Sequence, residues 1–151
     1  MNQDRIIAVA MFSFTGGLVW ALFVILFLQE SLFNRFNLIG LFSSVIAPVV
    51  ITYLISPRIY KKEQSKRTKL FASFYGIGIT FLSFFLGSAI FFGFDLIQAE
   101  NALTFKMIQE LISLVLMGFL IATTLMSPGY ILGTFTGIIY VNYLNRKENE
   151  A

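Results

Sequence analysis

The chain alternates between long apolar segments and short polar ones, and this pattern predicts helices that cross a membrane. Residues 6–28, 36–56 and 70–94 form three nearly unbroken apolar runs of about 20 residues or more. Because an α-helix rises ~1.5 Å per residue, each run is long enough for a hydrocarbon core of about 30 Å. We therefore predict three spanning helices over these ranges, with a kink at Pro48 in the second.

The last apolar segment, 107–144, is too long for one straight crossing. Its 38 residues include a single charged residue, Glu110, and one helix of that length would reach roughly 57 Å. A Ser-Pro-Gly triplet at 127–129 interrupts it, and serine followed by proline is typical of a helix start, with the serine as N-cap. This predicts helices at 107–126 and 128–144, joined by a tight turn at the cytoplasmic surface, and five spans in all.

An arrangement with four spans is the alternative. The stretch 107–126 is then re-entrant or lies along the outer interface, and the triplet at 127–129 lies at or near membrane depth. In that case the first amides of the last helix, at 128–130, would suit an anion. Because 107–126 is apolar on all faces, it is poorly suited to lie flat in an interface, and five spans are favoured.

The composition supports an all-α, polytopic membrane helix bundle that forms a single domain over residues 1–151. Apolar residues make up 57% of the chain and charged residues only 13%, about half the charged share of a soluble domain. The first apolar run is longer than the apolar region of a secretory signal peptide, and no A-x-A-like cleavage site follows it. We therefore interpret it as a retained helix.

The polar loop at 57–69 orients the predicted helices. It carries six cations against Glu63 alone, and short loops rich in Lys and Arg remain cytoplasmic. This predicts a cytoplasmic N-terminus and loop, in a plasma (inner) membrane, and five spans then place the C-terminal tail outside. The loop cations are also candidates for contact with anionic lipid headgroups or a soluble partner. They are Arg58, Lys61, Lys62, Lys66, Arg67 and Lys69.

Small residues recur at helical spacing in three of the predicted helices. Spacings of three and four residues place them on one face, and a face of small side chains lets another helix approach closely. We predict that these stripes pack helices together within the chain. The alternatives are that one stripe, above all that of the last helix, binds a second copy or a partner, or that the hydroxyls coat a polar path. The residues are Gly40, Ser43, Ser44 and Ala47, then Ser73, Gly76, Thr80, Ser83 and Gly87, and finally Gly129, Gly133 and Gly137.

The sequence holds no set of residues typical of catalysis. It has no Cys and no His, which excludes thiolate chemistry, disulfides and His/Cys metal sites. No ionisable residue lies near the middle of a predicted span, where proton relays and ion paths place them. Glu110 lies in the first turn of its helix and is interpreted as an interfacial carboxylate, with the mouth of a cation path as the alternative. We predict no enzymatic activity, no cofactor and no metal.

Two classes of function remain. The first is a structural or accessory subunit that lies in the lipid bilayer and packs as a homo-oligomer or with a membrane-protein partner. We predict no nucleic-acid partner. The second is a small oligomeric channel or transporter for an ion or small solute, which would use hydroxyls and main-chain carbonyls. The lack of charge within the spans favours the first class, because coupled transport usually needs a titratable group.

Overall fold

The computed structural model describes residues 3–61, 63, 66–98 and 105–150, and every element within these ranges is a helix. Four segments within them are long and apolar enough to cross a membrane, at 3–28, 35–60, 69–94 and 106–125. The helices are α1 (Gln3–Phe23), which continues into a π-helical turn η1 (Val24–Leu28), α2 (Arg35–Ile55), α3 (Pro57–Tyr60), α4 (Lys69–Gln98), α5 (Phe105–Leu125) and α6 (Pro128–Asn149). The five long helices begin within three residues of the predicted starts.

Local chemistry determines where the first two helices end and begin. Gln29 adopts a left-handed conformation (φ 52°) and ends the π-helical turn. The Asn34 side chain accepts a hydrogen bond of 2.8 Å from the main-chain N–H of Phe36, and so caps α2. Asn37 is fully buried and donates to the carbonyl of Ser31 at 2.9 Å, which holds the short link against the new helix.

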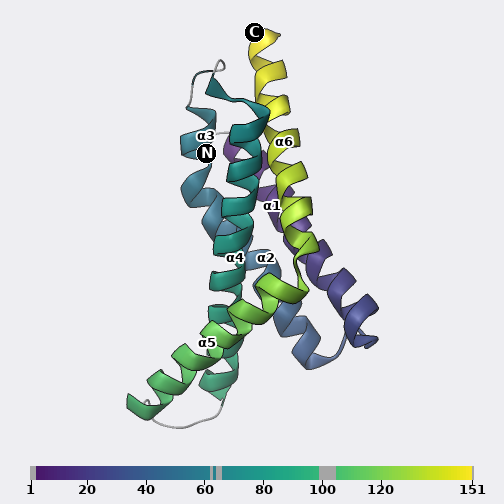
Figure 1. The fold of residues 1–151 in the computed structure, drawn as a ribbon, viewed down its shortest axis with the longest axis vertical. Coiled ribbons are helices and arrows are strands. Elements are labelled where there is room, and N and C mark those ends of the chain that lie inside the picture. Colours follow the sequence, from purple (N-terminus) through teal and green to yellow (C-terminus); the bar gives the residue numbers. More distant parts are fainter. Residues whose placement is uncertain (1–2, 62, 64–65, 99–104, 151) are drawn as a thin grey trace.

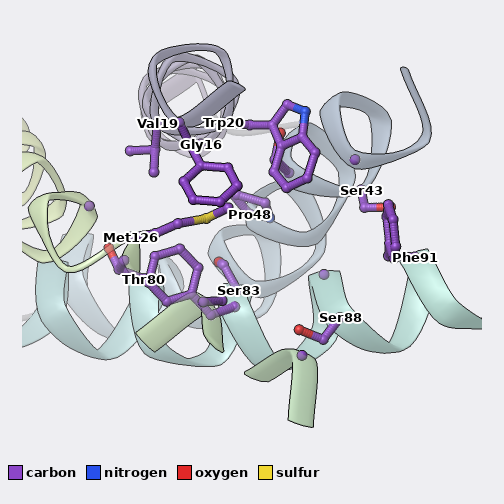
Figure 2. Close-up of a pocket in the computed structure, with 18 of the residues that line it drawn as sticks. Gly16, Val19, Trp20, Ser43, Pro48, Thr80, Ser83, Ser88, Phe91 and Met126 are labelled. Atoms are coloured by element: carbon purple, nitrogen blue, oxygen red, sulfur yellow. The ribbon is translucent and has the colours of Figure 1, made fainter. Parts of the chain in front are cut away.

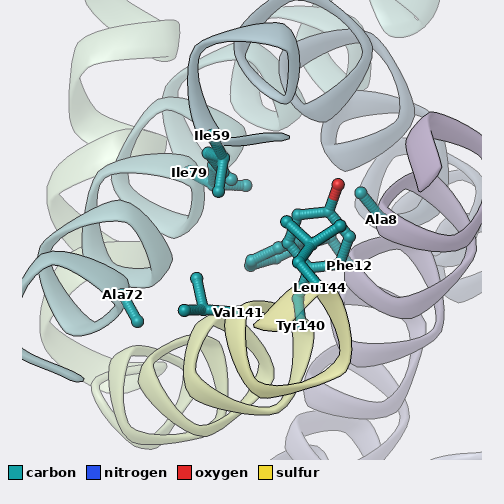
Figure 3. Close-up of a cluster of buried hydrophobic side chains, with 8 residues drawn as sticks. All are labelled: Ala8, Phe12, Ile59, Ala72, Ile79, Tyr140, Val141 and Leu144. Carbon is teal, nitrogen blue, oxygen red and sulfur yellow. The ribbon is translucent and has the colours of Figure 1, made fainter. Parts of the chain in front are cut away.

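Helices α1, α2, α4 and α6 pack as a bundle, and α5 leaves it at an oblique angle (Figure 1). In the bundle, α1 contacts α2 and α6, and α4 contacts α2 and α6; α5 packs chiefly on α4. The hydrophobic core lies where α1, α3, α4 and α6 meet, towards the end that holds the N-terminus (Figure 3). Its buried side chains are Ala8, Phe12, Ile59, Ala72, Ile79, Tyr140, Val141 and Leu144.

Two ion pairs hold the C-terminal end of α6 beside the start of α1 and the loop before α4. Lys147 Nζ lies 2.7 Å from Asp4 Oδ1, and Arg67 Nη2 lies 2.7 Å from Glu148 Oε1. The hydrogen bond to Asp4 raises the pKa of the Lys147 ammonium above its ordinary value. Residues 4 and 67 and the end of α6 thus lie together at one end of the bundle.

The Ser-Pro-Gly break lies beside the middle of two long helices. Gly129 lies against Val19 and Phe84, which belong to the interior of α1 and α4. Figure 1 shows the reason: α5 runs obliquely from the far end of α4 to the middle of the bundle, and α6 continues from there to the end that holds the N-terminus. Tilt and a break thus accommodate the long apolar segment.

Candidate functional site

A cavity of about 380 Å³ lies between α1, α2 and α4, and the last turns of α5 and the start of α6 complete its wall. Figure 2 shows Thr80 and Ser83 of α4 on one side of this space and Val19 and Trp20 of α1 on the other. The cavity is therefore next to the break between α5 and α6. Its walls also include Ser43, Ser44, Phe84, Ser88, Phe91, Phe92, Gly118, Met126 and Gly129.

Close packing between α1 and α2 forms one wall of the cavity. The indole of Trp20 lies directly over Gly40, where a Cβ atom would overlap the ring, and its Nε1 donates to the Asn37 carbonyl at 2.9 Å. A Cβ at Gly16 would likewise overlap the Ser44 carbonyl oxygen. Pro48 has no N–H to bond that carbonyl within α2, so the Gly16 backbone covers an oxygen that the proline has released.

The hydroxyl groups of the cavity differ in their hydrogen bonding. Three of them donate to carbonyls one turn earlier in their own helices: Ser43 to Ile39 at 2.8 Å, Ser44 to Leu41 at 2.8 Å and Thr80 to Gly76 at 2.9 Å. The Oγ of Ser83, by contrast, has no hydrogen-bond partner in the described part of the chain, although this residue is only 7% exposed. Sequence reasoning placed all four among helix-packing residues and had no signal that would single out Ser83.

The described residues that line the cavity carry no charge. Glu110, the one carboxylate considered for a path mouth, is exposed on α5, 3.9 Å from Lys106, and is not among the lining residues. Nowhere in the described ranges do three His, Cys, Asp or Glu residues come together as metal ligands. The cavity therefore offers hydrophobic contact and hydroxyl groups to a ligand, with no counter-charge.

The start of α6 does not have the cap that the sequence suggested. Ser127 is in the helical region (φ −51°, ψ −32°), and its side chain makes no capping hydrogen bond. The amides of Gly129 and Tyr130 donate to the carbonyls of Met126 and Ser127 at 2.8 and 3.0 Å. These amides are already used within the turn, which argues against the anion site considered for 128–130.

The small residues of α4 and α6 meet each other directly. A Cβ atom at Gly76 would overlap the Gly133 carbonyl, one at Gly133 would overlap the Thr80 hydroxyl, and one at Gly137 would overlap the Ala72 carbonyl. The glycine face of α6 is thus covered by α4 of the same chain, which leaves that face no room for a second copy. Thr15 of α1 and Thr136 of α6 share a hydrogen bond of 2.8 Å on another face.

The remaining small residues are distributed around α2 and α4. Gly87 faces Ala47 and the Ser43 carbonyl, and a Cβ atom at Gly87 would be 3.7 Å from both. Ser73 is half-buried and donates to the Lys69 carbonyl at 2.9 Å. The small side chains at Gly87 and Ala47 allow α2 and α4 to run close together beside the cavity.

The basic loop does not present all of its cations to the surroundings. Arg58, Lys61, Lys66 and Lys69 are exposed, and Lys66 pairs with Glu63 at 2.7 Å. The Arg67 side chain is only 3% exposed; it pairs with Glu148 and donates to the Tyr60 carbonyl at 2.9 Å. Arg67 is thus paired within the chain and is less available to headgroups or a partner than the four exposed cations. Lys62 lies outside the described residues.

Taken together, the residues provide one uncharged cavity beside a helix break, and a polar network that closes one end of the bundle. Of these two features, the cavity is the better candidate for a binding site, because a ligand there would contact four helices of the bundle as well as α5. No family model, no curated protein and no solved structure matches this chain.

Proposed function

We propose that the protein is a small, non-enzymatic integral membrane protein that binds an uncharged small solute inside the bilayer, in the channel or transporter class. The observation that carries this proposal is the cavity of about 380 Å³ beside the α5–α6 break. Its volume falls in the range of ligand pockets, about 300–1,000 Å³. Interrupted helices next to a central site are also a recurrent feature of transporters.

The proposed placement in the membrane has four crossings. Residues 3–28, 35–60 and 69–94 make the first three, and α5 and α6 together make the fourth, with the break near mid-depth. The cation-rich loop at 57–69 supports a cytoplasmic location for itself and for the N-terminus. The ion pairs Asp4–Lys147 and Arg67–Glu148 support the same side for the end of α6. We place the protein in a plasma (inner) membrane.

The wall chemistry supports a neutral solute. A charged group transferred into a low-dielectric site without a partner is strongly disfavoured, and the described wall residues have no charge to offer it. The aromatic side chains of Trp20, Phe84, Phe91 and Phe92 favour a lipophilic molecule instead.

Trp20 provides the test, because it is the one tryptophan of the sequence and lines the cavity. We would reconstitute the protein in lipid nanodiscs and titrate bromododecane, whose bromine quenches tryptophan fluorescence on contact. Saturable quenching is expected in the wild-type protein. The control is a substitution of another lining residue, Ala122→Phe, which keeps Trp20 and adds an aromatic ring to the cavity wall. Quenching in this variant should rise only in proportion to the probe in the bilayer. Equal, non-saturating quenching of both proteins would rule out a binding cavity.

A structural or accessory subunit is the second candidate, and the surface of α5 favours it. Only 6% of the apolar stretch of α5 is buried, because this helix packs chiefly on α4 alone. Its exposed large side chains are Ile108, Ile112, Leu114, Leu116, Met117, Leu120, Ile121 and Leu125. Native mass spectrometry after extraction in mild detergent tests this role. A particle of one chain with no associated protein would exclude it.

A further inference from the structure

We infer that the cavity ligand is a neutral lipophilic molecule with one hydrogen-bonding group, a hydroxyl or a carbonyl, and that Ser83 binds this group. The inference rests on the proposed binding function and adds the chemical class of the ligand. It starts from the Ser83 hydroxyl, which is buried at the cavity wall and has no hydrogen-bond partner in the described ranges.

Ser83 is distinct from neighbouring hydroxyls of the same wall. Ser43 and Thr80 donate to carbonyls of their own helices, as serine and threonine usually do in membrane helices. Ser83 makes no such bond, although it occupies the middle of an apolar helix. A buried hydroxyl without a partner destabilises the empty protein, and a ligand that accepts its hydrogen bond removes that penalty on binding.

The rest of the wall determines the other part of the ligand. Phe84, Phe91 and Phe92 of α4 line the same cavity as Ser83, and Trp20 of α1 lies on the opposite side of this space (Figure 2). A pure hydrocarbon would satisfy these aromatic surfaces and leave the Ser83 hydroxyl unpaired. An ionic head group would find no counter-charge among the described lining residues. A single neutral polar group on an apolar body meets both conditions.

The test compares two probes of the same length in nanodiscs, bromododecane and a dodecanol brominated at its far end, again read by quenching of Trp20. The alcohol should half-saturate at a concentration about tenfold lower than the alkane, the effect expected for one buried hydrogen bond. Ser83→Ala should abolish this preference. Ser43→Ala is the matched control, because it removes a hydroxyl of the same wall that already has a partner, and it should retain the preference.

A second measurement needs no ligand. Since Ser83→Ala removes an unpaired buried hydroxyl, the empty variant should melt at the same temperature as the wild type or higher. A lower melting temperature would show that the hydroxyl already has a partner and would overturn the inference.

The outcomes separate the two proposals. If both probes saturate with equal affinity, or if Ser83→Ala keeps the preference for the alcohol, binding in the cavity stands and the assignment of Ser83 is wrong. If neither probe saturates, the proposed function itself is wrong. A preference for the alcohol that Ser43→Ala abolishes as completely as Ser83→Ala would assign the polar contact to the wall in general and contradict the role of Ser83.

Discussion

Lys147 and Asp4, which are separated by 143 positions in the sequence, form an ion pair of 2.7 Å between the end of α6 and the start of α1. The pair places both helix ends at one end of the bundle. If the first helix starts and the last helix ends on the same side of a membrane, the chain crosses that membrane an even number of times. The relationship therefore underlies the proposed four crossings.

The first prediction follows from this pairing. Alkaline phosphatase fused after Ala151 should be inactive in intact cells, and a fluorescent protein that folds only in the cytoplasm should be bright there. The control is the same pair of reporters fused after residue 100, which follows the third of the proposed crossings, so the pattern should reverse there. An active phosphatase after Ala151 would show that the two helix ends are separated by the membrane.

The second prediction concerns the buried guanidinium of Arg67. Glu148→Gln removes the counter-ion of Arg67 and should lower the free energy of unfolding by about 1–3 kcal/mol. This is less than the loss of a fully buried ion pair would cost, because Glu148 is 43% exposed. Glu150→Gln is the control, because it breaks the exposed Arg146–Glu150 pair, which should cost less than ~1 kcal/mol. Thermal unfolding in detergent measures both. Equal effects would mean that Arg67 does not depend on Glu148.

The third prediction is a dependence on alkaline pH. The pKa of Lys147 is raised above its ordinary value of 10.5 by its hydrogen bond to Asp4. A raised pKa means that the native state holds this proton more tightly, so the stabilisation is complete below pH 10.5 and is lost as the pH rises through the raised pKa. The difference in melting temperature between wild type and Lys147→Gln should be constant from pH 7 to 9 and shrink above pH 10.5. A difference that persists unchanged at higher pH would contradict the role of the charge.

The fourth prediction compares two glycines of α4. Gly76→Ala places a methyl group against the Gly133 backbone and should destabilise the protein by about 1–3 kcal/mol. Gly78→Ala is the matched control, since nothing lies within 4 Å of a Cβ atom there, and alanine should be neutral or stabilising by up to ~1 kcal/mol. Thermal unfolding in the same detergent distinguishes them. Equal stability of the two variants would mean that α4 and α6 do not pack through Gly76.

The helices themselves could be predicted from the sequence. Apolar runs at 6–28, 36–56 and 70–94 correspond to α1 with η1, α2 and α4, because the length of such a run reports directly how far a helix can extend before polar residues end it. The triplet at 127–129 was also recognised as a break, since Pro128 cannot donate the N–H that would continue α5. The lack of Cys and His limited the chemistry in the same direct way.

Contacts between distant segments decided the rest. The length of an apolar run gives the length of a helix but neither its tilt nor its neighbours, so the sequence of 107–144 is compatible with two arrangements. The oblique course of α5 supports the one that we propose. The same limit applies to side chains: in the sequence Arg67 is one more cation of a loop, whereas in the structure it is buried and paired with Glu148 of α6. In the sequence Ser83 is one more small residue of a stripe. Only the tertiary structure shows that its hydroxyl lacks a partner and lies at a cavity formed by five helices.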